Sequence, residues 1–258
     1  MDTKQLFDLT GKVAVITGGS RGLGRQMALA FADSGADVMV VSRKLDSCQS
    51  VVDEIIAKGR KAKAYACHMG RWDEIDGLVE AAYETFGKVD IVVNNAGLSP
   101  LYPALSAITE ELFDKVVGLN LKGPFRLNAL VGERMAANGG GSIINVSSTA
   151  AVTPSPAAEP YGAAKAGLNA LTRSLAYAFG PTVRVNAIMP GPFLTDISKA
   201  WDMEKFQERA DKMIPLQRGG QPEEIVGAAL YFASNASSFT TGSVLCVDGG
   251  GQGSRMIE

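Results

Sequence analysis

The fold is decided by Thr17-Gly18-Gly19-Ser20-Arg21-Gly22-Leu23-Gly24, a glycine-rich stretch that joins a short β-branched run to a segment of helical period. Backbone amides at the start of such a helix, together with the helix dipole, attract an anion such as a diphosphate. We expect Gly18 to take the turn, Gly22 to let a ligand approach the backbone, and Gly24 to let the helix pack closely on the strand. The stretch therefore predicts a dinucleotide site, with a flexible turn that binds no ligand as the plainer alternative.

Short β-branched runs alternate with longer stretches of helical period along the whole chain. This alternation is typical of a parallel sheet covered by helices. The predicted strands span residues 12–17, 37–42, 61–67, 89–93, 142–147, 183–188 and 243–247. The predicted helices span residues 23–34, 46–58, 72–86, 110–138, 160–179 and 222–234, with a weaker helical pattern at 198–212. We expect one Rossmann-type α/β domain over residues 1–258, a doubly wound seven-stranded parallel sheet with helices on both faces, which binds ligands beyond the carboxyl ends of its strands.

The composition excludes several classes of protein. A chain of 258 residues with 46% hydrophobic side chains can bury a full core. The 25 basic and 27 acidic residues leave a formal net charge of -2 and form no basic run, which argues against a nucleic-acid partner. The three cysteines lie far apart without the partners of a zinc site, so no metal is predicted. Without a signal-peptide core or an apolar stretch of membrane-spanning length, the protein is expected to be cytoplasmic, with no membrane partner.

The end of the predicted second strand indicates which dinucleotide binds. NAD-specific sites place Asp or Glu there to bind the ribose hydroxyl, whereas a 2'-phosphate requires cations. Here Ser42 stands in the acidic position, Arg43 follows it, and Arg21 lies in the glycine turn. Two guanidinium groups would bind the phosphate and no carboxylate would repel it. NADP(H) is therefore favoured over NAD(H), which remains the alternative if Arg43 is an ordinary solvated charge.

A tyrosine and a lysine four residues apart carry the predicted chemistry. Tyr161 and Lys165 share one face of a predicted helix, one turn apart. A free phenol has a pKa of about 10, and a nearby ammonium favours its ionised form, so we expect Lys165 to lower the pKa of Tyr161. Ser147 and Ser148 end the predicted fifth strand, where a hydroxyl can hydrogen-bond a substrate oxygen. The plainer interpretation of the tyrosine and lysine is an exposed helix face.

The glycine turn also fits G-x-S-x-G, the nucleophile motif of α/β-hydrolases, with Ser20 as the nucleophile. That mechanism needs an acid and then a histidine later in the chain. The only histidine, His68, lies too early for this order, so we interpret the match as coincidence.

Several motifs occur in the order that a known family has them. After the TGxxxGxG turn come Asn94-Asn95-Ala96-Gly97, then Asn120, then a Tyr-x-x-x-Lys at 161–165, and then Pro190-Gly191 with Thr195. On these motifs the chain resembles the short-chain dehydrogenase/reductase family over nearly its full length. Among the members of that family it looks most like the 3-oxoacyl-[acyl-carrier-protein] reductases and related bacterial carbonyl reductases.

The resemblance implies an oxidoreductase that interconverts a carbonyl and a secondary alcohol. In the implied tetrad, Tyr161 exchanges the proton and Ser148 polarises the carbonyl. Lys165 holds the ribose and lowers the tyrosine pKa, and Asn120 supports a water relay. Ser148 fits the family spacing better than Ser147, which stays open. The cofactor-binding candidates are Gly18, Ser20, Arg21, Gly22, Leu23, Gly24, Ser42, Arg43, Asn95, Ala96, Gly97, Tyr161, Lys165, Pro190, Gly191, Phe193 and Thr195.

One position departs from the family pattern. Where the family has an Asp that meets the adenine, this chain has Cys67-His68-Met69-Gly70. His68 either contacts the base or is a structural residue at the strand end, and the second role is the commoner one for a lone histidine.

Substrate preference is expected to come from the loops at 98–102 and 149–159 and from a lid at about 193–214. The apolar residues of the lid either line a pocket or pack the lid on the body. The partners expected are a small carbonyl or alcohol substrate, free or carrier-bound, and the further copies of a homotetramer that the resemblance implies. Two alternatives remain: a sugar, polyol or steroid dehydrogenase of the same family, and a non-catalytic dinucleotide-binding sensor, which would not need Tyr161, Lys165, Ser148 and Asn120 together.

Overall fold

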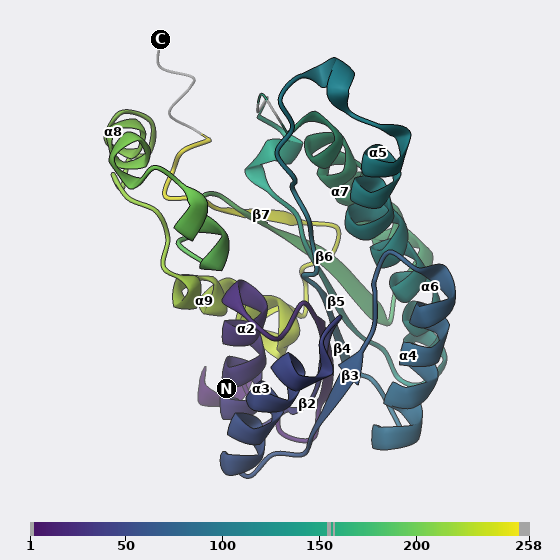
Figure 1. Ribbon diagram of the computed structural model, residues 1–258. Coiled ribbons are helices and arrows are strands. Elements are labelled where there is room, and N and C mark those ends of the chain that lie inside the picture. The colour runs from purple at the N-terminus through teal and green to yellow at the C-terminus, as the bar shows by residue number, and fades with distance from the viewer. Residues whose placement is uncertain (1–2, 154–155, 157, 253–258) are drawn as a thin grey trace.

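A computed structural model describes residues 3–153, 156 and 158–252 and shows one sheet between two layers of helices (Figure 1). Within these residues the sheet has seven strands: β1 (Val13–Thr17), β2 (Asp37–Ser42), β3 (Ala62–Ala66), β4 (Ile91–Asn94), β5 (Gly141–Val146), β6 (Val183–Pro190) and β7 (Val244–Val247). The strands are all parallel, in the order β3-β2-β1-β4-β5-β6-β7. The predicted fold and all seven predicted strands are confirmed, with ends that differ by up to two residues.

The helices cover the sheet on both faces, as predicted. They are α1 (Thr3–Leu6), α2 (Gly22–Asp33), α3 (Leu45–Ala57), α4 (Trp72–Phe86), α5 (Glu110–Val117), α6 (Gly123–Ala137), α7 (Glu159–Phe179), α8 (Met203–Met213) and α9 (Val226–Ala233). Helices α2, α3 and α9 lie on one face, and α4, α6 and α7 lie on the other (Figure 1). Among the described residues, none of these helices combines the length and the apolar character needed to cross a bilayer.

The alternation of side chains along each strand divides the core into two clusters. In β1, Ile16 packs with Phe31 of α2 on one face, whereas Val15 packs with Leu78 of α4 on the other. All five residues of β1 are buried, because a central parallel strand is covered on both sides. This burial explains why the strands appear in the sequence as continuous runs of β-branched residues.

The helix predicted at 110–138 is present but is not a uniform α-helix. Helix α5 passes into a π-helical turn at Gly118–Lys122 before α6 begins. Asn120 lies in that turn, and its Nδ2 donates a hydrogen bond to the carbonyl oxygen of Val116 at 2.9 Å. A side chain that takes a carbonyl from the helical ladder makes the turn wider, which a sequence period near 3.6 does not reveal.

The carboxyl ends of β1 and β4 meet where the strand order reverses. Thr17 pairs with Asn94 in the sheet, and the Thr17 hydroxyl accepts hydrogen bonds from the amides of Asn95 at 3.0 Å and Ala96 at 3.1 Å. The same hydroxyl donates to the carbonyl of Val93 at 3.2 Å. One buried threonine therefore joins the glycine-rich turn to the loop after β4, at the edge where parallel sheets bind their ligands.

Candidate active site

The glycine-rich turn has the backbone that its sequence predicts. Gly18 and Gly22 have φ angles of 65° and 54°, in the left-handed region that favours glycine. A Cβ at Gly24 would collide with the carbonyl oxygen of Gly18, so α2 packs against the turn only because position 24 has no side chain. Asn95 closes the turn from the other side, with Nδ2 donating to the carbonyls of Thr17 at 3.0 Å and Gly18 at 3.1 Å.

The start of α2 is suited to an anion. The residue before the helix, Arg21, makes no side-chain cap, and the first turn contains no acidic residue. The first amides of a helix have no partner within it, so those of Gly22, Leu23 and Gly24 can donate hydrogen bonds to an external ligand. A Cβ at Gly22 would first meet the side chain of Thr195 at 3.5 Å, which places the base of the predicted lid over the turn. These features fit a diphosphate.

The end of β2 lies beside the turn. The Gly19 amide donates to the Val41 carbonyl at 3.2 Å. The Ser42 hydroxyl is engaged locally, 3.1 Å from the Lys44 carbonyl and 3.0 Å from the Cys48 sulfur. Arg43 is exposed and, among the residues that the structure describes, has neither a hydrogen bond nor an ion pair. Its cation is therefore available to a ligand at this edge.

Arg21 is also exposed. The pKa of Asp196 at the lid base is lowered mainly by its hydrogen bond and ion pair with Lys199, and the charge of Arg21 adds to this effect. His68, which replaces the adenine-side acid of the family, is partly buried just after β3. Its Nδ1 accepts a hydrogen bond from the Gly70 amide at 3.1 Å, and its own amide donates to Glu74 at 2.6 Å. These bonds give His68 a structural role at the strand end, and contact with adenine stays a prediction.

The structure brings Tyr161, Lys165 and Ser148 together. Both Tyr161 and Lys165 lie in the first turns of α7, and Ser148 lies just after β5 and hydrogen-bonds with Tyr161. The Lys165 Nζ lies 5.7 Å from the centroid of the Tyr161 ring and donates to the Val146 carbonyl at 2.7 Å. The other candidate serine, Ser147, is buried, and its hydroxyl donates to the Lys165 carbonyl at 3.4 Å. Of the two serines, Ser148 is therefore the one beside the phenol.

The prediction that Lys165 lowers the pKa of Tyr161 is wrong for this structure. Burial raises the pKa of the Tyr161 phenol above its usual value, and the hydrogen bond with Ser148 offsets this only in part. Burial also lowers the pKa of Lys165 to about 8. Both groups lose hydration that favours their charged forms, and this loss outweighs the attraction between them. In this state the phenol is protonated at neutral pH and is ready to act as an acid.

Asn120 lies next to the same site and is fully buried. A Cβ placed on Gly97 would lie 3.0 Å from the Asn120 Oδ1 and 3.7 Å from the Lys165 Nζ. The π-helical turn, the loop after β4 and α7 therefore converge at one point. The Asn120 amide hydrogen-bonds the protein at both ends, so its visible role is to hold the loop, and the water relay stays a prediction.

The predicted lid is anchored at its base and contains α8 (Figure 1). Phe193 is buried in the core and forms an isolated parallel bridge with Gly220. In the lid the rings of Trp201 and Phe206 lie 5.2 Å apart, and a Cβ on Gly219 would meet Phe206 at 3.2 Å. Phe193 therefore packs the base of the lid on the body, whereas Trp201 and Phe206 pack against each other within the lid.

The remaining cofactor candidates lie at the carboxyl edge near β6. Pro190 ends the strand and is buried, and the Gly191 amide donates to the Val247 carbonyl at 3.0 Å. Ser20 and Leu23 are partly buried in the glycine turn. In the predicted substrate loop at 149–159, Pro154, Ser155 and Ala157 lie outside the described residues.

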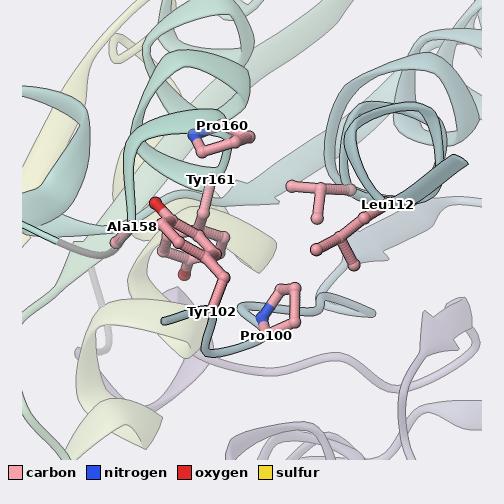
Figure 2. A pocket seen from close by; sticks show the side chains of 7 residues that line it. Pro100, Tyr102, Leu112, Ala158, Pro160 and Tyr161 are labelled. Carbon is pink, nitrogen blue, oxygen red and sulfur yellow. The ribbon is translucent and has the colours of Figure 1, made fainter. Parts of the chain in front are cut away.

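A small hollow opens beside Tyr161 (Figure 2). It is too narrow for a water molecule in this structure, and its lining is almost entirely apolar. Besides Tyr161, the lining consists of Pro100, Tyr102, Leu112, Val116, Ala158 and Pro160. Pro100 and Tyr102 lie in the loop at 98–102 that was predicted to contact substrate. Leu112 and Val116 were not singled out from the sequence, because their proximity to Tyr161 depends on contacts between residues more than forty positions apart.

A network of buried polar side chains supports the strands and helices that carry the site. It was not predicted from the sequence. The Asn94 Nδ2 donates to Asn128 at 2.5 Å and to Asn145 at 3.0 Å, and Asn145 donates to Thr172 at 2.9 Å. These bonds join β4, α6, β5 and α7 beneath the tyrosine. Among the described residues no cluster of side chains could hold a metal ion.

Known proteins are similar to this chain in both sequence and fold. A family model described as enoyl-(acyl carrier protein) reductase matches residues 18–252, which include every predicted site residue. An uncharacterized oxidoreductase of Mycobacterium tuberculosis is 42% identical over 247 residues, which cover 95% of this chain and 94% of that protein.

Two solved structures are similar over nearly the whole chain. One is a 7α-hydroxysteroid dehydrogenase complexed with NADH and 7-oxo glycochenodeoxycholic acid, with a TM-score of 0.93 and 36% identity, covering 97% of this chain and 98% of that one. The other is a 3-oxoacyl (acyl-carrier-protein) reductase of Agrobacterium tumefaciens with NADP bound, with a TM-score of 0.91 and 33% identity, covering 96% and 97%.

Proposed function

The chain belongs to the short-chain dehydrogenase/reductase family and is an NAD(P)-dependent oxidoreductase, and we propose that it uses NADP(H) to interconvert a carbonyl and a secondary alcohol with Tyr161 as the acid/base. One observation carries this proposal: the phenol of Tyr161 hydrogen-bonds with Ser148, and the Lys165 ammonium lies over the Tyr161 ring, at the same sheet edge as the glycine-rich turn. A protein that only senses a dinucleotide has no need of this arrangement.

The residues at the carboxyl edge of the sheet have two tasks: some would hold the cofactor, and others would transfer the proton. The diphosphate would lie at the start of α2 against Gly22, Leu23 and Gly24, with the nicotinamide end toward Tyr161 and Lys165. When bound, the dinucleotide supplies or accepts the hydride.

Proton transfer is the task of the chain itself. In reduction, Tyr161 donates its phenolic proton to the substrate oxygen, which Ser148 polarises by a hydrogen bond. The Lys165 ammonium, held by the Val146 carbonyl, stabilises the phenolate that remains. In oxidation the phenolate takes the proton back from the alcohol.

NADP(H) is proposed on the basis of two exposed cations. Arg43 follows β2 and Arg21 precedes α2, so both flank the position where an adenosine 2'-phosphate would lie, and Ser42 adds no negative charge. The steroid dehydrogenase described above binds NADH and the 3-oxoacyl reductase binds NADP, so the family as a whole supports either dinucleotide.

A homotetramer is also proposed, and a cytoplasmic location stays a prediction. Apolar side chains remain exposed on two separate faces, which supports more than one contact between copies. Phe125 of α6 stacks near Trp72 of α4, with the ring centroids 6.2 Å apart, and Leu245 is exposed on the edge strand β7. Light scattering on the purified protein would give the mass of the assembly.

The proposed function is tested by following the absorbance of NADPH and NADH with the purified protein. The panel contains acetoacetyl thioesters, diketones, keto sugars and keto steroids. Turnover of a β-ketoacyl thioester would assign an acyl reductase, and turnover of a sugar or steroid would assign the corresponding dehydrogenase. Tight binding of the dinucleotide with no turnover of any class would contradict catalysis and favour the sensor.

A further inference from the structure

His68 follows β3 at the carboxyl edge of the sheet and has no part in the proton transfer. The chain just before it lies beside the end of β2, because the Cys67 amide donates a hydrogen bond to the Ser42 carbonyl at 2.9 Å. In the strand order β3-β2-β1, the ends of β1 and β3 are two strand spacings apart, about 10 Å. His68 therefore lies one strand beyond the residues proposed to hold the 2'-phosphate.

This order of strands indicates where the adenine of the proposed dinucleotide would lie. The diphosphate is assigned to the turn after β1, and the ribose that carries the 2'-phosphate is assigned to Arg43 after β2. The base is attached to that same ribose, so it would continue along the edge toward β3, whereas the nicotinamide end runs the other way toward Tyr161. The residue that follows β3 at this edge is His68.

One ring nitrogen of His68 is already engaged by the protein. The Gly70 amide donates a hydrogen bond to Nδ1 at 3.1 Å, so Nδ1 carries no proton. A neutral imidazole with an unprotonated Nδ1 carries its proton on Nε2, which is then a donor. Within the described part of the chain no group hydrogen-bonds to Nε2, and the side chain is only partly buried. The polar group that His68 can offer to a ligand is thus an N–H donor.

The loop that carries the ring is held on several sides. The His68 amide donates to the Glu74 carboxylate at 2.6 Å. A Cβ on Gly70 would lie only 3.0 Å from the His68 Cε1, so the ring lies directly against that glycine. A Cβ on Gly123 would collide with the Met69 carbonyl, so the start of α6 packs closely on the loop. The position of His68 is therefore fixed by the protein itself.

We propose that His68 recognises the adenine of the dinucleotide as a hydrogen-bond donor to an acceptor atom of the base, and not as an acceptor from its amino group. The proposal rests on the function proposed above and specifies how the cofactor of that function is recognised. Adenine offers acceptors at its ring nitrogens and a donor at its 6-amino group. A carboxylate can accept only from the amino group, whereas Nε2–H can donate only to an acceptor.

This difference predicts how the protein treats a modified base. Hypoxanthine has an oxygen in place of the 6-amino group of adenine, so that position is an acceptor instead of a donor. A carboxylate would repel this oxygen, whereas the Nε2–H of His68 can donate to an acceptor of either base. We therefore expect little discrimination between NADPH and nicotinamide hypoxanthine dinucleotide phosphate (deamino-NADPH).

Fluorescence titration with NADPH and with deamino-NADPH gives the two dissociation constants without any turnover. In the wild type, the Kd for deamino-NADPH should lie within about threefold of the Kd for NADPH. His68→Asp keeps an acceptor for the Gly70 amide, because an Asp side chain accepts from the amide two residues on, but it offers the base a carboxylate. The ratio of Kd for deamino-NADPH to Kd for NADPH should then rise about tenfold.

His68→Asn is the matched control. Its side-chain oxygen also accepts from the Gly70 amide, while its Nδ2 remains a donor, so this variant should keep the wild-type ratio. The Asn and Asp variants therefore compare a donor with an acceptor at one position of the same loop. His68→Ala removes the donor altogether and should weaken the binding of both dinucleotides by a similar factor, about threefold.

Two results would overturn the proposal while leaving the proposed function intact. One is a wild type that binds NADPH about tenfold or more tightly than deamino-NADPH, because the amino group would then be read by an acceptor. The other is an equal ratio in His68→Asp and His68→Asn, because no polar contact with the base would then come from this position. Failure of the wild type to bind either dinucleotide would refute this proposal and the proposed function together.

Discussion

Asn120 and Leu98 hydrogen-bond each other in both directions: the Asn120 Nδ2 donates to the Leu98 carbonyl at 2.8 Å, and the Leu98 amide donates to the Asn120 Oδ1 at 3.2 Å. The same Nδ2 donates to the Val116 carbonyl. One buried amide thus ties the π-helical turn to the loop after β4. That loop carries Tyr102, so the bond also places the rim of the hollow.

Asn120→Ala is expected to destabilise the protein by about 2 to 4 kcal/mol, because it leaves buried backbone groups at Leu98 and Val116 without partners. Urea unfolding measures the change. Asn138→Ala is the matched control, since its Nδ2 also donates to a helical carbonyl, that of Arg134 at 2.8 Å, but is exposed. The control should lose less than about 1 kcal/mol, and equal losses in both variants would show that Asn120 does not anchor the loop.

Tyr161→Phe is expected to lower kcat by about 10²- to 10⁴-fold while leaving the affinity for NADPH close to that of the wild type, because only the proton donor is removed. Steady-state kinetics and a fluorescence titration measure the two effects. Tyr177→Phe, at a residue that is 91% exposed on α7, should change neither. A kcat for Tyr161→Phe within a few-fold of the wild type would assign the proton to another group.

The two directions of the reaction should respond oppositely to pH. The raised pKa of Tyr161 keeps the phenol protonated through neutral pH, so carbonyl reduction should be fast there and decline as alkaline pH removes the proton. Alcohol oxidation needs the phenolate and should rise over the same alkaline range. Initial rates from pH 6 to about pH 11 check this, because the raised pKa lies above the ordinary phenol value of about 10. Parallel profiles in both directions would mean that Tyr161 does not control the proton.

Lys165 should make stability depend on pH above neutrality. Its folded pKa of about 8 lies below the ordinary value of 10.5, so between these values the unfolded chain holds a proton that the folded protein has lost. The free energy of unfolding therefore rises with pH across that window, by about 3 kcal/mol in total, and below it the full cost of the buried charge remains.

Lys165→Met should abolish this rise, and urea unfolding at both ends of the window measures it. Lys63→Met, at an exposed lysine of β3, is the control and should keep the rise of the wild type. A Lys165→Met variant with the same pH dependence as the wild type would show that another group is responsible.

Arg43→Ala combined with Arg21→Ala should lower the preference for NADPH over NADH by about 10- to 100-fold, because each guanidinium contributes charge-assisted hydrogen bonds to the 2'-phosphate. Dissociation constants for both dinucleotides measure the preference. Arg173→Ala removes an exposed cation of α7 and should leave it as it is. An unchanged preference in the double variant would remove the basis for NADP(H).

Local patterns were sufficient for the sheet and for the glycine-rich turn. The β-branched runs mark buried parallel strands, and the left-handed angles of Gly18 and Gly22 occur where the sequence offers glycine. Tyr161 and Lys165 share a helix face because their spacing is one turn. In each case the relevant contacts lie within a few residues along the chain.

The features that were not predicted from the sequence depend on contacts between residues distant in the chain or on the loss of hydration. The attachment of the π-helical turn to the loop after β4 depends on Asn120 reaching Leu98, and the hydrogen-bonded pair of Tyr102 and Glu159 joins positions 57 residues apart. The direction of the Tyr161 pKa depends on burial, which spacing to Lys165 does not reveal.

The sequence by itself determined the parallel sheet, the dinucleotide turn and the Tyr161–Lys165 pair, because these follow from period, glycine placement and helical spacing. Only the tertiary structure decided that Ser148 rather than Ser147 lies beside the phenol, that burial outweighs the lysine charge, and that Tyr102 hydrogen-bonds with Glu159. The physical reason is that hydrogen bonds across the fold and the loss of water are set by what surrounds a side chain, and the chain brings those surroundings together only when it folds.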